Sequence, residues 1–547
     1  MGYNTRMTDD TNGPQGAIEL SQVTQALLQA TKSIAPKKKP DEYTKITVSR
    51  AVSFFAIAYE KVRNTIEFRE EHLMRRAAIE RIAKRRLSMN PLGTGEGAHI
   101  IRELLWARYF PADSFSDVDS NEIQKIIDIY VGLKASLTTG RPKDTANFLD
   151  EFLYDLLTCE IEEYLSPDVA QRENIFTYFI FQLLKNKVKV ADLSIDVQNA
   201  LLLTTIEKSY RKSDIAYQRF HLFNVFYKPI AQYTPQELKE LAPKFPKIFE
   251  KIDDTLKNPL VDKIKKFVKK QLPPFLILFD IIKNHEGADL KAILSDKAKL
   301  WSEVDLLCRQ KYAAVQKRLR ALAVRSLIYV FITKMLFAII LEGPLSQYFF
   351  GEVEWISIII NSLFPPLFML VIILFNRIPD EENTNRIYTR IIDILDTDPS
   401  FENKVAMLAQ KVKPRRPALQ IGFSFFYVAT FIVTLYLMWL VLSALKFNII
   451  SQAIFLFFVS TIAFFAHRIK QVTNEYKLIE KDSFFTPFAD FFFMPMLAMG
   501  KFFSSELAKL NFFTFLFDIL IEAPYKLIIE VVEEWISFTR NKKEEIV

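Results

Sequence analysis

The sequence predicts an all-α, polytopic membrane protein with a large N-terminal soluble helical domain. Four long apolar runs lie between charged flanks, at Ser326–Leu341, Trp355–Phe375, Ile421–Leu445 and Ile449–Ala466. Glycine is scarce: the 547 residues include only 13, where average usage of about 7% would give roughly 38. Such a composition disfavours β folds with tight glycine turns and glycine-rich phosphate-binding loops, so helices are the expected elements throughout.

The apolar runs have lengths suited to crossing a bilayer. A helix rises about 1.5 Å per residue, so about 20 apolar residues cross a hydrocarbon layer of roughly 30 Å. The second and third runs meet this length, and the first and fourth are near its lower limit. We therefore expect a four-span membrane domain over residues 321–470, with a cytoplasmic loop over 377–420.

The positions of the basic residues predict the orientation. Lys and Arg collect on one side of the four runs, at Lys317, Arg318, Arg320, Arg325, Arg377, Lys411, Lys413, Arg415, Arg416, Arg468 and Lys470. The other side offers residues 343–354, which contain no Lys or Arg, and a short turn with Lys446. Because short cytoplasmic loops are rich in Lys and Arg, both termini are predicted to be cytoplasmic. Cys159 and Cys308 then lie in a reducing compartment, where a disulfide is not expected.

The region before the first run divides into two parts. Residues 1–40 are polar and are expected to form a disordered tail, within which 18–31 has a short helical pattern. Residues 41–320 are expected to form a cytoplasmic all-helical domain. Its helical patterns include a long one over 41–87 and further ones over 121–137, 144–165, 168–187 and 196–227.

The long pattern over 41–87 combines a heptad seam with a basic segment. The seam is Val48, Val52, Phe55, Tyr59, Val62 and Ile66, which fits either a coiled-coil contact or a helix face packed on the domain core. Arg75, Arg76, Arg81, Lys84, Arg85 and Arg86 follow, interleaved with glutamates. This interleaving favours a solvated face with i,i+4 ion pairs over a surface for an acidic partner, and nucleic-acid binding is not expected at a net charge of +7.

We find no sequence motif for catalysis, metal binding or a cofactor. The glycines of Gly93-Thr94-Gly95-Glu96-Gly97 precede a helical pattern, but no strand comes before them and no Lys-Ser/Thr pair follows. They are interpreted as a flexible inter-helix loop. The five histidines lack His-x-x-x-His spacing, and no Gly-x-Ser-x-Gly occurs. An enzyme is therefore not the favoured interpretation.

A basic amphipathic pattern covers 258–271. Its apolar stripe runs from Leu260 to Val268, and its flanks carry Lys263, Lys265, Lys266, Lys269 and Lys270. Such a helix can lie on anionic lipid head groups, or it can be an ordinary surface helix of the domain. The pair Pro273-Pro274 is expected to end it.

The first apolar run contains a lysine, which is costly inside a bilayer. Lys334 and Asn361 are expected at similar depth, and Pro365 and Pro366 leave the carbonyls of Asn361 and Ser362 without helical donors. Lys334 is predicted to donate to those carbonyls. The resulting polar site either fastens two helices together or lines a path for an ion or anion.

These features predict an integral membrane scaffold that presents a helical cytoplasmic domain to a protein partner or to a second copy. Residues 471–547 are expected to add an interfacial, amphipathic helical extension. The alternative is a transporter or channel subunit built on the polar site around Lys334 and the proline-kinked second span.

Overall fold

The computed structural model describes residues 16–34, 45–46, 71–190, 193–351, 355–375, 378–396, 408–410, 417–478 and 494–502, together with 531, 535 and 538–539. The described residues are predominantly helical, which confirms the all-α class. The heptad seam over 48–66 and most of the 471–547 extension lie outside them.

The chain divides into two compact units. The N-terminal unit takes in Leu20–Lys269 and a short strand from Glu402–Lys411, and the apolar unit takes in Lys270–Phe401 and Val412–Phe515 with the N-terminal residues up to Glu19. The division lies inside one helix, whereas the sequence analysis placed it near residue 320. The helices after residue 270 belong with the apolar helices because they pack on the first part of the longest of them.

The N-terminal unit contains ten complete helices among its described residues, along with the start of an eleventh. They are α1 (Gln22–Lys32), α3 (Glu71–Met89), α4 (Glu96–Trp106), α5 (Asp117–Thr138), α6 (Lys143–Leu165), α7 (Pro167–Leu184), α8 (Ile195–Tyr210), α9 (Ile215–Phe226), α10 (Pro235–Leu241), α11 (Phe245–Leu256) and the start of α12 (Leu260–Asn284). Short turns of 3₁₀ helix are η2 (Lys185–Lys187), η3 (Ile230–Gln232) and η4 (Ala242–Lys244). Strands β1 (Val188–Val190) and β2 (Leu408–Gln410) pair in parallel, with Val188 opposite Leu408.

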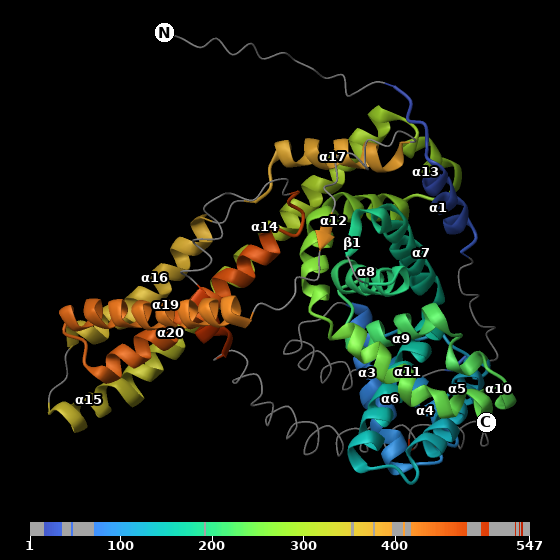
Figure 1. Cartoon of the computed structure of the whole chain (residues 1–547), viewed down its shortest axis with the longest axis horizontal. Helices are drawn as coiled ribbons and strands as arrows, with labels where there is room; N and C mark the ends of the chain where they lie inside the picture. Colours follow the sequence, from blue (N-terminus) through green and yellow to red (C-terminus); the bar gives the residue numbers. More distant parts are fainter. Residues whose placement is uncertain are drawn as a thin grey trace. The chain divides into compact units, whose positions relative to one another are not determined.

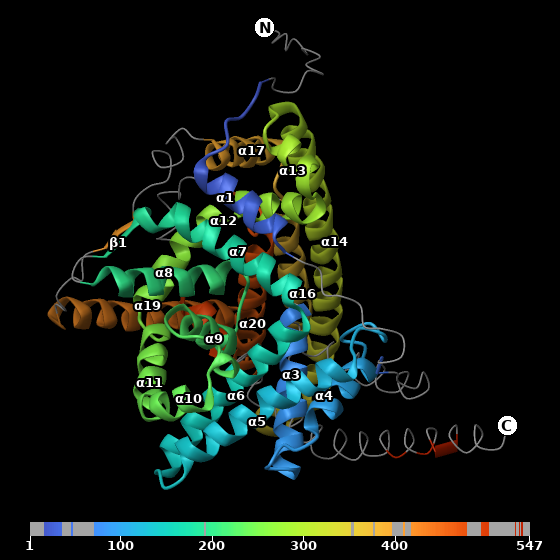
Figure 2. The same ribbon diagram turned by 90° about the vertical axis from the view of Figure 1, so that its right-hand side faces the viewer.

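Helix α6 is the centre of this unit. It packs against α3, α5 and α9, as Figures 1 and 2 show. Its Phe152 is fully buried and stacks on Phe249 of α11, with ring centroids 4.0 Å apart. Burial of aromatic side chains of this size is a main source of stability for a helical domain.

Two expectations for this unit need correction. The single helix predicted over 196–227 is two helices, because Asp214 caps α9 by accepting a hydrogen bond from the Tyr217 amide. Part of the expected disordered tail is the packed helix α1, which contacts α7. Its Leu27 and Leu28 are buried, and this apolar face compensates for the entropy of ordering the segment.

The glycines of 93–97 have a packing role in an ordered loop. Gly93 and Gly95 adopt φ of +69° and +80°, which favour glycine. A Cβ at Gly97 would lie 2.5 Å from the Ser120 carbonyl oxygen, so only glycine allows α4 to approach α5 this closely. Gln124 of α5 fastens the loop: its Oε1 accepts from the Gly97 amide, and its Nε2 donates to the Gly93 carbonyl.

The apolar unit contains the rest of α12 and a series of longer helices. They are α13 (Gly287–Leu294), α14 (Lys297–Phe337), η5 (Ala338–Glu342, a π-helix), α15 (Gly343–Phe350), α16 (Trp355–Phe375), α17 (Glu381–Leu395), α19 (Pro417–Ala444) and α20 (Ile449–Thr473), followed by helical residues 494–502. Helix α14 has 41 residues and passes from charged sequence into the first apolar run.

Pairs of adjacent prolines lie inside two of these helices. Helix α12 continues through Pro273 and Pro274, where the sequence analysis expected it to end. Leu272 and Phe275 beside them are buried, which offsets the hydrogen bonds that proline cannot make. Helix α16 likewise continues through Pro365 and Pro366.

Helices α14, α16 and α20 pack side by side (Figures 1 and 2). Their contact is formed by Val315 and Leu319 of α14, Met369 of α16, and Phe458, Ile462 and Ile469 of α20. Among the described residues, one segment is long and apolar enough to span a membrane: Ile421–Ala444 of α19, with a mean hydropathy of 2.2. The apolar parts of α16 and α20, Trp355–Val371 and Ile449–Phe465, are shorter.

Candidate functional site: a buried lysine–glutamate pair

The helical path from α14 through η5 to α15 turns small or polar residues inward. Lys334, Ala338, Glu342 and Ser346 are buried at intervals of four residues. The large apolar side chains between them face outward, and Ile339 is 67% exposed. A helix of a water-soluble protein normally has the opposite distribution, with apolar residues inward and polar residues outward.

Helix α16 repeats this pattern. Its buried positions are Ser357, Asn361, Pro365 and Met369, again at intervals of four. Its exposed positions are large and apolar: Ile356, Ile359, Leu363, Phe364, Leu367, Leu370 and Val371. Together with the outward face of α14 they form a continuous apolar exterior of a kind that marks a surface for lipid or for another protein.

The inward faces of α14, η5, α16 and α20 meet at one polar cluster, which we call the Lys334 centre. The Lys334 ammonium donates to Glu342 Oε2 at 3.1 Å. Asn361 Nδ2 donates to Glu342 Oε1 at 2.7 Å and to the Ser451 carbonyl oxygen at 3.1 Å. All four residues are fully buried, and the ammonium also lies 5.1 Å from the ring centroid of Phe458.

The π-helix η5 makes the pairing of Lys334 with Glu342 geometrically favourable. At 3.6 residues per turn, a residue eight positions along has rotated about 80° past the first residue's face. The wider π turn holds an extra residue, closed by the bond from the Gly343 amide to the Ala338 carbonyl, and this offsets most of that rotation. Glu342 therefore returns to the face of Lys334, and two long side chains bridge the rise between them.

The structure brings some of the predicted site residues together and gives Lys334 a different partner. Lys334 and Asn361 both contact Glu342, whereas the sequence analysis directed the ammonium to the carbonyls of Asn361 and Ser362. Ser362 and Pro366 are half-buried, and Pro365 is buried in α16. Glu342 was missed because it ends the apolar run. The signal that could have found it is the interval of four shared by Lys334, Ala338, Glu342 and Ser346.

The Lys334 centre also contains hydrogen-bond acceptors without a donor. Asn361 Oδ1 and Ser451 Oγ are buried and have no hydrogen-bond partner. The orientation of the Asn361 amide is determined by its two acceptors, so its oxygen has to point away from them. The carbonyls of Asn361 and Ser362 lack helical donors because Pro365 and Pro366 have no N–H.

The predicted basic helix exposes lysines but not its apolar stripe. Val261, Ile264 and Val268 are buried, so this stripe is already covered by protein and is not available to lipid. Lys263, Lys266 and Lys269 are exposed, and Lys265 and Lys270 are half-buried. Burial and the charges of Lys269 and Lys208 lower the pKa of Lys265. Only the lysines are thus placed to contact head groups.

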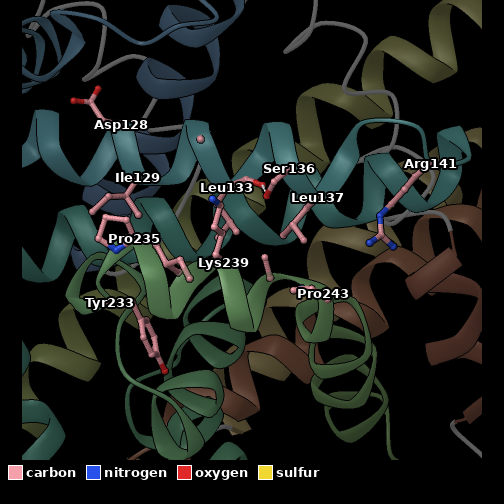
Figure 3. A pocket seen from close by; sticks show the side chains of 13 residues that line it. Asp128, Ile129, Leu133, Ser136, Leu137, Arg141, Tyr233, Pro235, Lys239 and Pro243 are labelled. Atoms are coloured by element: carbon pink, nitrogen blue, oxygen red, sulfur yellow. Dashed lines mark hydrogen bonds between the residues drawn. The ribbon is translucent and has the colours of Figure 1, made fainter.

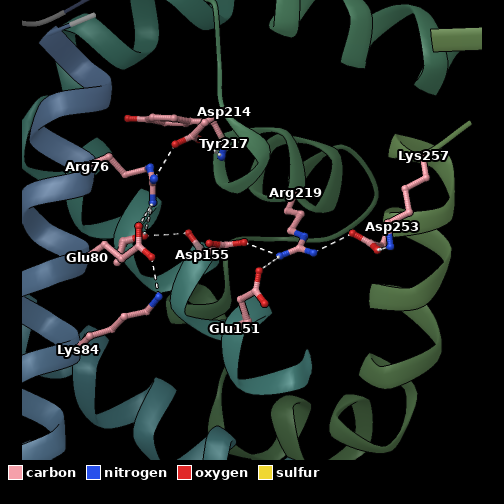
Figure 4. Close-up of polar contacts among 11 residues, drawn as sticks. Arg76, Glu80, Lys84, Glu151, Asp155, Asp214, Tyr217, Arg219, Asp253 and Lys257 are labelled. Atoms are coloured by element: carbon pink, nitrogen blue, oxygen red, sulfur yellow. Dashed lines mark hydrogen bonds and ion pairs between the residues drawn. The ribbon is translucent and has the colours of Figure 1, made fainter. Parts of the chain in front are cut away.

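In the N-terminal unit, three arginines of the basic segment of α3 are buried: Arg75, Arg76 and Arg86. The expectation of a solvated face is wrong for them, whereas Lys84 is exposed and forms an i,i+4 pair with Glu80, as expected. Arg76 is 4% exposed and pairs with Asp214 at 2.5 Å and with Glu80 at 2.9 Å (Figure 4). Arg75 pairs with Glu162, and Arg86 with Glu103. Carboxylates from α4, α6 and the start of α9 meet this face of α3, which periodicity within one helix cannot show.

A second arginine completes this network. Arg219 of α9 donates to Asp155 of α6 at 2.7 Å and to Asp253 of α11 at 2.8 Å, linking three helices (Figure 4). Burial raises the pKa of Asp155 to about 6, and the interaction with Arg219 only partly opposes this. Each of these buried charges has a charged partner, as buried ions require.

Three glutamates close together in α6, Glu160, Glu162 and Glu163, each have different partners. Glu160 accepts from the Tyr130 hydroxyl at 2.7 Å and from the Ala231 amide at 3.1 Å, and burial raises its pKa to about 7. Glu162 pairs with Arg75. Glu163 lies 2.9 Å from His221, whose pKa burial alone would lower but which the charge of Glu207 raises to about 9. These glutamates are thus part of the packed interior.

A surface pocket of 670 Å³ lies between α5 and the segment that contains α10 and η4 (Figure 3). Leu133, Leu137 and Leu238 supply its apolar wall, and its polar side chains include Asp128, Arg141 and Lys239. No local sequence pattern indicates this pocket. Within the described residues, no three His, Cys, Asp or Glu side chains are grouped as metal ligands.

No protein-family model matches the chain, and no curated protein sequence and no solved structure shows significant similarity to it.

Proposed function

We propose that the protein is an integral membrane scaffold that presents its N-terminal helical unit for interaction with another protein. The observation that carries this is the reversed polarity of the apolar unit. Helices α14–α15 and α16 bury Lys, Glu, Asn and Ser and expose Ile, Leu and Phe. Lipid tails favour such an exterior, and ionisable residues in membrane segments face the bundle interior and pair there.

The N-terminal unit supports the second half of this proposal. Its buried arginines are paired with carboxylates of its own helices, which favours a rigid platform over a reactive site. Its pocket offers a mixed apolar and charged surface on which a partner segment could dock. The excess of Lys and Arg on one side of the apolar runs supports a cytoplasmic location for this unit and for both termini.

The test of membrane attachment is extraction of cell membranes with alkaline carbonate. We expect the full-length chain to stay in the pellet, and release into the supernatant would overturn the proposal. Single-cysteine variants at Gln347 and at Arg318, in a background with Cys159 and Cys308 changed to Ser, then test the topology. A membrane-impermeant maleimide should label Gln347→Cys in intact cells and Arg318→Cys only after permeabilisation.

The test of the scaffold role is purification of the tagged full-length protein from its own cells in mild detergent. We expect a stoichiometric partner whose binding is weakened by Lys239→Glu, a charge reversal at an exposed position in the pocket, and unaffected by Tyr178→Ser, a change at an exposed position on α7. A chain that purifies without any partner would contradict the scaffold role.

The second candidate function is a transporter or channel subunit. The Lys334 centre favours it, because an ion pair and unpaired acceptors buried among apolar helices are a usual feature of substrate and ion pathways. Ion flux through liposomes that contain the purified protein tests this candidate. Flux that is lost in Lys334→Met with retained folding would support it, and liposomes no leakier than empty ones would exclude it.

A further inference from the structure

We propose that the pocket between α5 and the α10–η4 segment binds residues 527–543 of the same chain as an amphipathic helix. This inference rests on the proposed function, because the pocket and residues 527–543 have to lie on the same side of the membrane. It also deepens that function, since it names what a partner has to displace from the pocket before it can dock there.

The α5 side of the pocket is shaped to receive a helix. Leu133 and Leu137 are buried at its base (Figure 3). Beside them Asp128, Gly132 and Ser136 form an exposed row at intervals of four residues, with side chains that are short or absent. Such a row runs along the helix and leaves a groove into which the side chains of another helix can pack. The pocket volume of 670 Å³ leaves room for large side chains.

The rim of the pocket carries charges that lack an opposite charge. Arg141 and Lys239 are exposed, and neither forms an ion pair with any residue that the structure describes. Asp128 accepts a hydrogen bond from Gln124 Nε2 but pairs with no cation among the same residues. Figure 3 shows Asp128 and Arg141 at opposite ends of the α5 side. A matching occupant is therefore acidic at one end and basic at the other.

Residues 527–543 have this distribution of charge next to an exposed apolar stripe. Val531, Trp535 and Phe538 are helical and more than half exposed, and their intervals of four and three residues place them on one helix face. Three glutamates lie beside this stripe and three basic residues follow it: Glu530, Glu533, Glu534, Arg540, Lys542 and Lys543. Large aromatic side chains of this kind are the usual anchors of an interface.

The two charge distributions determine the direction of the bound helix. Its glutamates pair with Arg141 and Lys239 and its basic residues with Asp128, so it runs antiparallel to α5. The macrodipoles of two antiparallel neighbouring helices also attract each other. The lengths agree, since the stripe from Val531 to Phe538 covers about 10 Å and the row from Asp128 to Ser136 about 12 Å.

The same chain is the favoured source of the occupant. Linkage to its site raises the effective concentration of a segment, up to the millimolar range for a suitable linker, whereas a second copy has to bind at its own concentration. An anionic lipid surface, the other apolar environment available to the stripe, repels the three glutamates. The pocket instead offers them Arg141 and Lys239.

Disulfide crosslinking of the full-length protein in its own membranes tests this proposal. We expect Ser136→Cys and Val531→Cys together to form a disulfide on mild oxidation. Both thiols should then resist a PEG-linked maleimide, while the chain keeps the mass of a monomer on a non-reducing gel. Cys159 and Cys308 stay in place, because both are fully buried and their resistance to the maleimide shows that the chain is folded.

The matched control is Ser136→Cys combined with Thr539→Cys. Thr539 lies eight residues beyond Val531, which is about 12 Å along a helix, whereas a disulfide needs Cβ atoms about 3.5–4.5 Å apart. In the Ser136→Cys/Val531→Cys protein, Lys239→Glu should lower the disulfide yield about fivefold, as expected for loss of a surface ion pair. Lys125→Glu, at an exposed position of α5 outside the pocket, should leave the yield unchanged.

Thiols that stay free in both pairs would overturn the proposal. A disulfide with Thr539→Cys in place of Val531→Cys would overturn the charge pairing that supports it, and a disulfide-linked dimer would assign the pocket to a second copy. The single variant Val531→Cys tests the membrane placement separately. If a membrane-impermeant maleimide labels it in intact cells, residues 527–543 are not cytoplasmic and the proposed topology is wrong, whatever the pocket binds.

Discussion

The two units of this protein both pair buried charges with opposite charges, but the polarity of their outer surfaces differs. In the N-terminal unit, Arg76 and Arg219 are buried beside two or more carboxylates each. In the apolar unit, Lys334 is buried beside Glu342. Both arrangements avoid an unpaired ion in a medium of low dielectric constant.

The outer surfaces differ because the solvents we assign to them differ. The N-terminal unit surrounds its aromatic core with polar helix faces, whereas α14 and α16 surround polar residues with Ile, Leu and Phe. The position of polar residues relative to the packed interior therefore indicates the environment of a unit better than its overall hydrophobicity does.

The largest effect is expected from Arg219→Met. This change leaves Asp155 and Asp253 buried without their shared cation, so the N-terminal unit should lose about 3–5 kcal/mol of stability. The measurement is the temperature at which the fully buried Cys159 becomes reactive to a thiol dye, in a Cys308→Ser background. Lys257→Met is the control, because its side chain is 75% exposed and its pair with Asp253 should contribute less than about 1 kcal/mol. Equal shifts for both variants would contradict this account.

Charge on the outward face of α16 should come next in size. Ile359→Arg places a guanidinium on the face assigned to lipid, at a cost of about 3 kcal/mol for insertion. Ile195→Arg of α8, at a position that is also exposed, should change stability by no more than about 0.5 kcal/mol. The readout is the fraction of each variant that resists carbonate extraction. If Ile359→Arg resists extraction as fully as Ile195→Arg, water rather than lipid surrounds α16.

Glu160→Gln should remove a pH dependence from the N-terminal unit. The folded pKa of Glu160, about 7, lies above its ordinary value, so its stabilising effect is present below pH 4.5 and is lost as the pH rises through 7. Wild-type stability should fall by up to about 3 kcal/mol more than that of Glu160→Gln between pH 5 and 8. The thermal exposure of Cys159, compared at each pH, measures the difference.

Tyr130→Phe sharpens the same test. The Tyr130 hydroxyl donates to Glu160 and lowers the pKa of that carboxyl against the effect of burial. Its removal should therefore raise the pKa further and move the loss of stability to higher pH. A profile identical to wild type would show that another group titrates in this range.

The smallest effect compares two glycines of the same unit. Gly97→Ala brings a Cβ to within 2.5 Å of the Ser120 carbonyl oxygen and should destabilise by about 1–3 kcal/mol. Gly132→Ala on α5 meets open space and should stabilise by up to about 1 kcal/mol, because alanine is the better helix former. Denaturant titration, followed by the reactivity of Cys159, measures whether the free energy of unfolding of each variant is lower or higher than that of wild type. Destabilisation by Gly132→Ala would contradict the packing argument.

Local patterns were sufficient to predict most helices. Helices α5, α6 and α16 begin and end within a few residues of the predicted bounds, because apolar periodicity and capping residues act over one or two turns. The break at Asp214 was missed because α8 and α9 continue the same apolar composition on both sides. The helix through Pro273 and Pro274 was missed because local rules omit the burial that holds it.

Composition and periodicity are sufficient to predict the all-α class, the apolar runs and the lysine among them. Which charges meet depends on tertiary packing: Arg76 pairs with Asp214, Arg219 with Asp155, and Lys334 with Glu342 across a π turn. These two kinds of interaction differ in the sequence distance over which they act. Helix formation depends on neighbours a few residues away, whereas a buried charge is stabilised by a partner that packing brings from elsewhere in the chain, 138 positions away for Arg76 and Asp214.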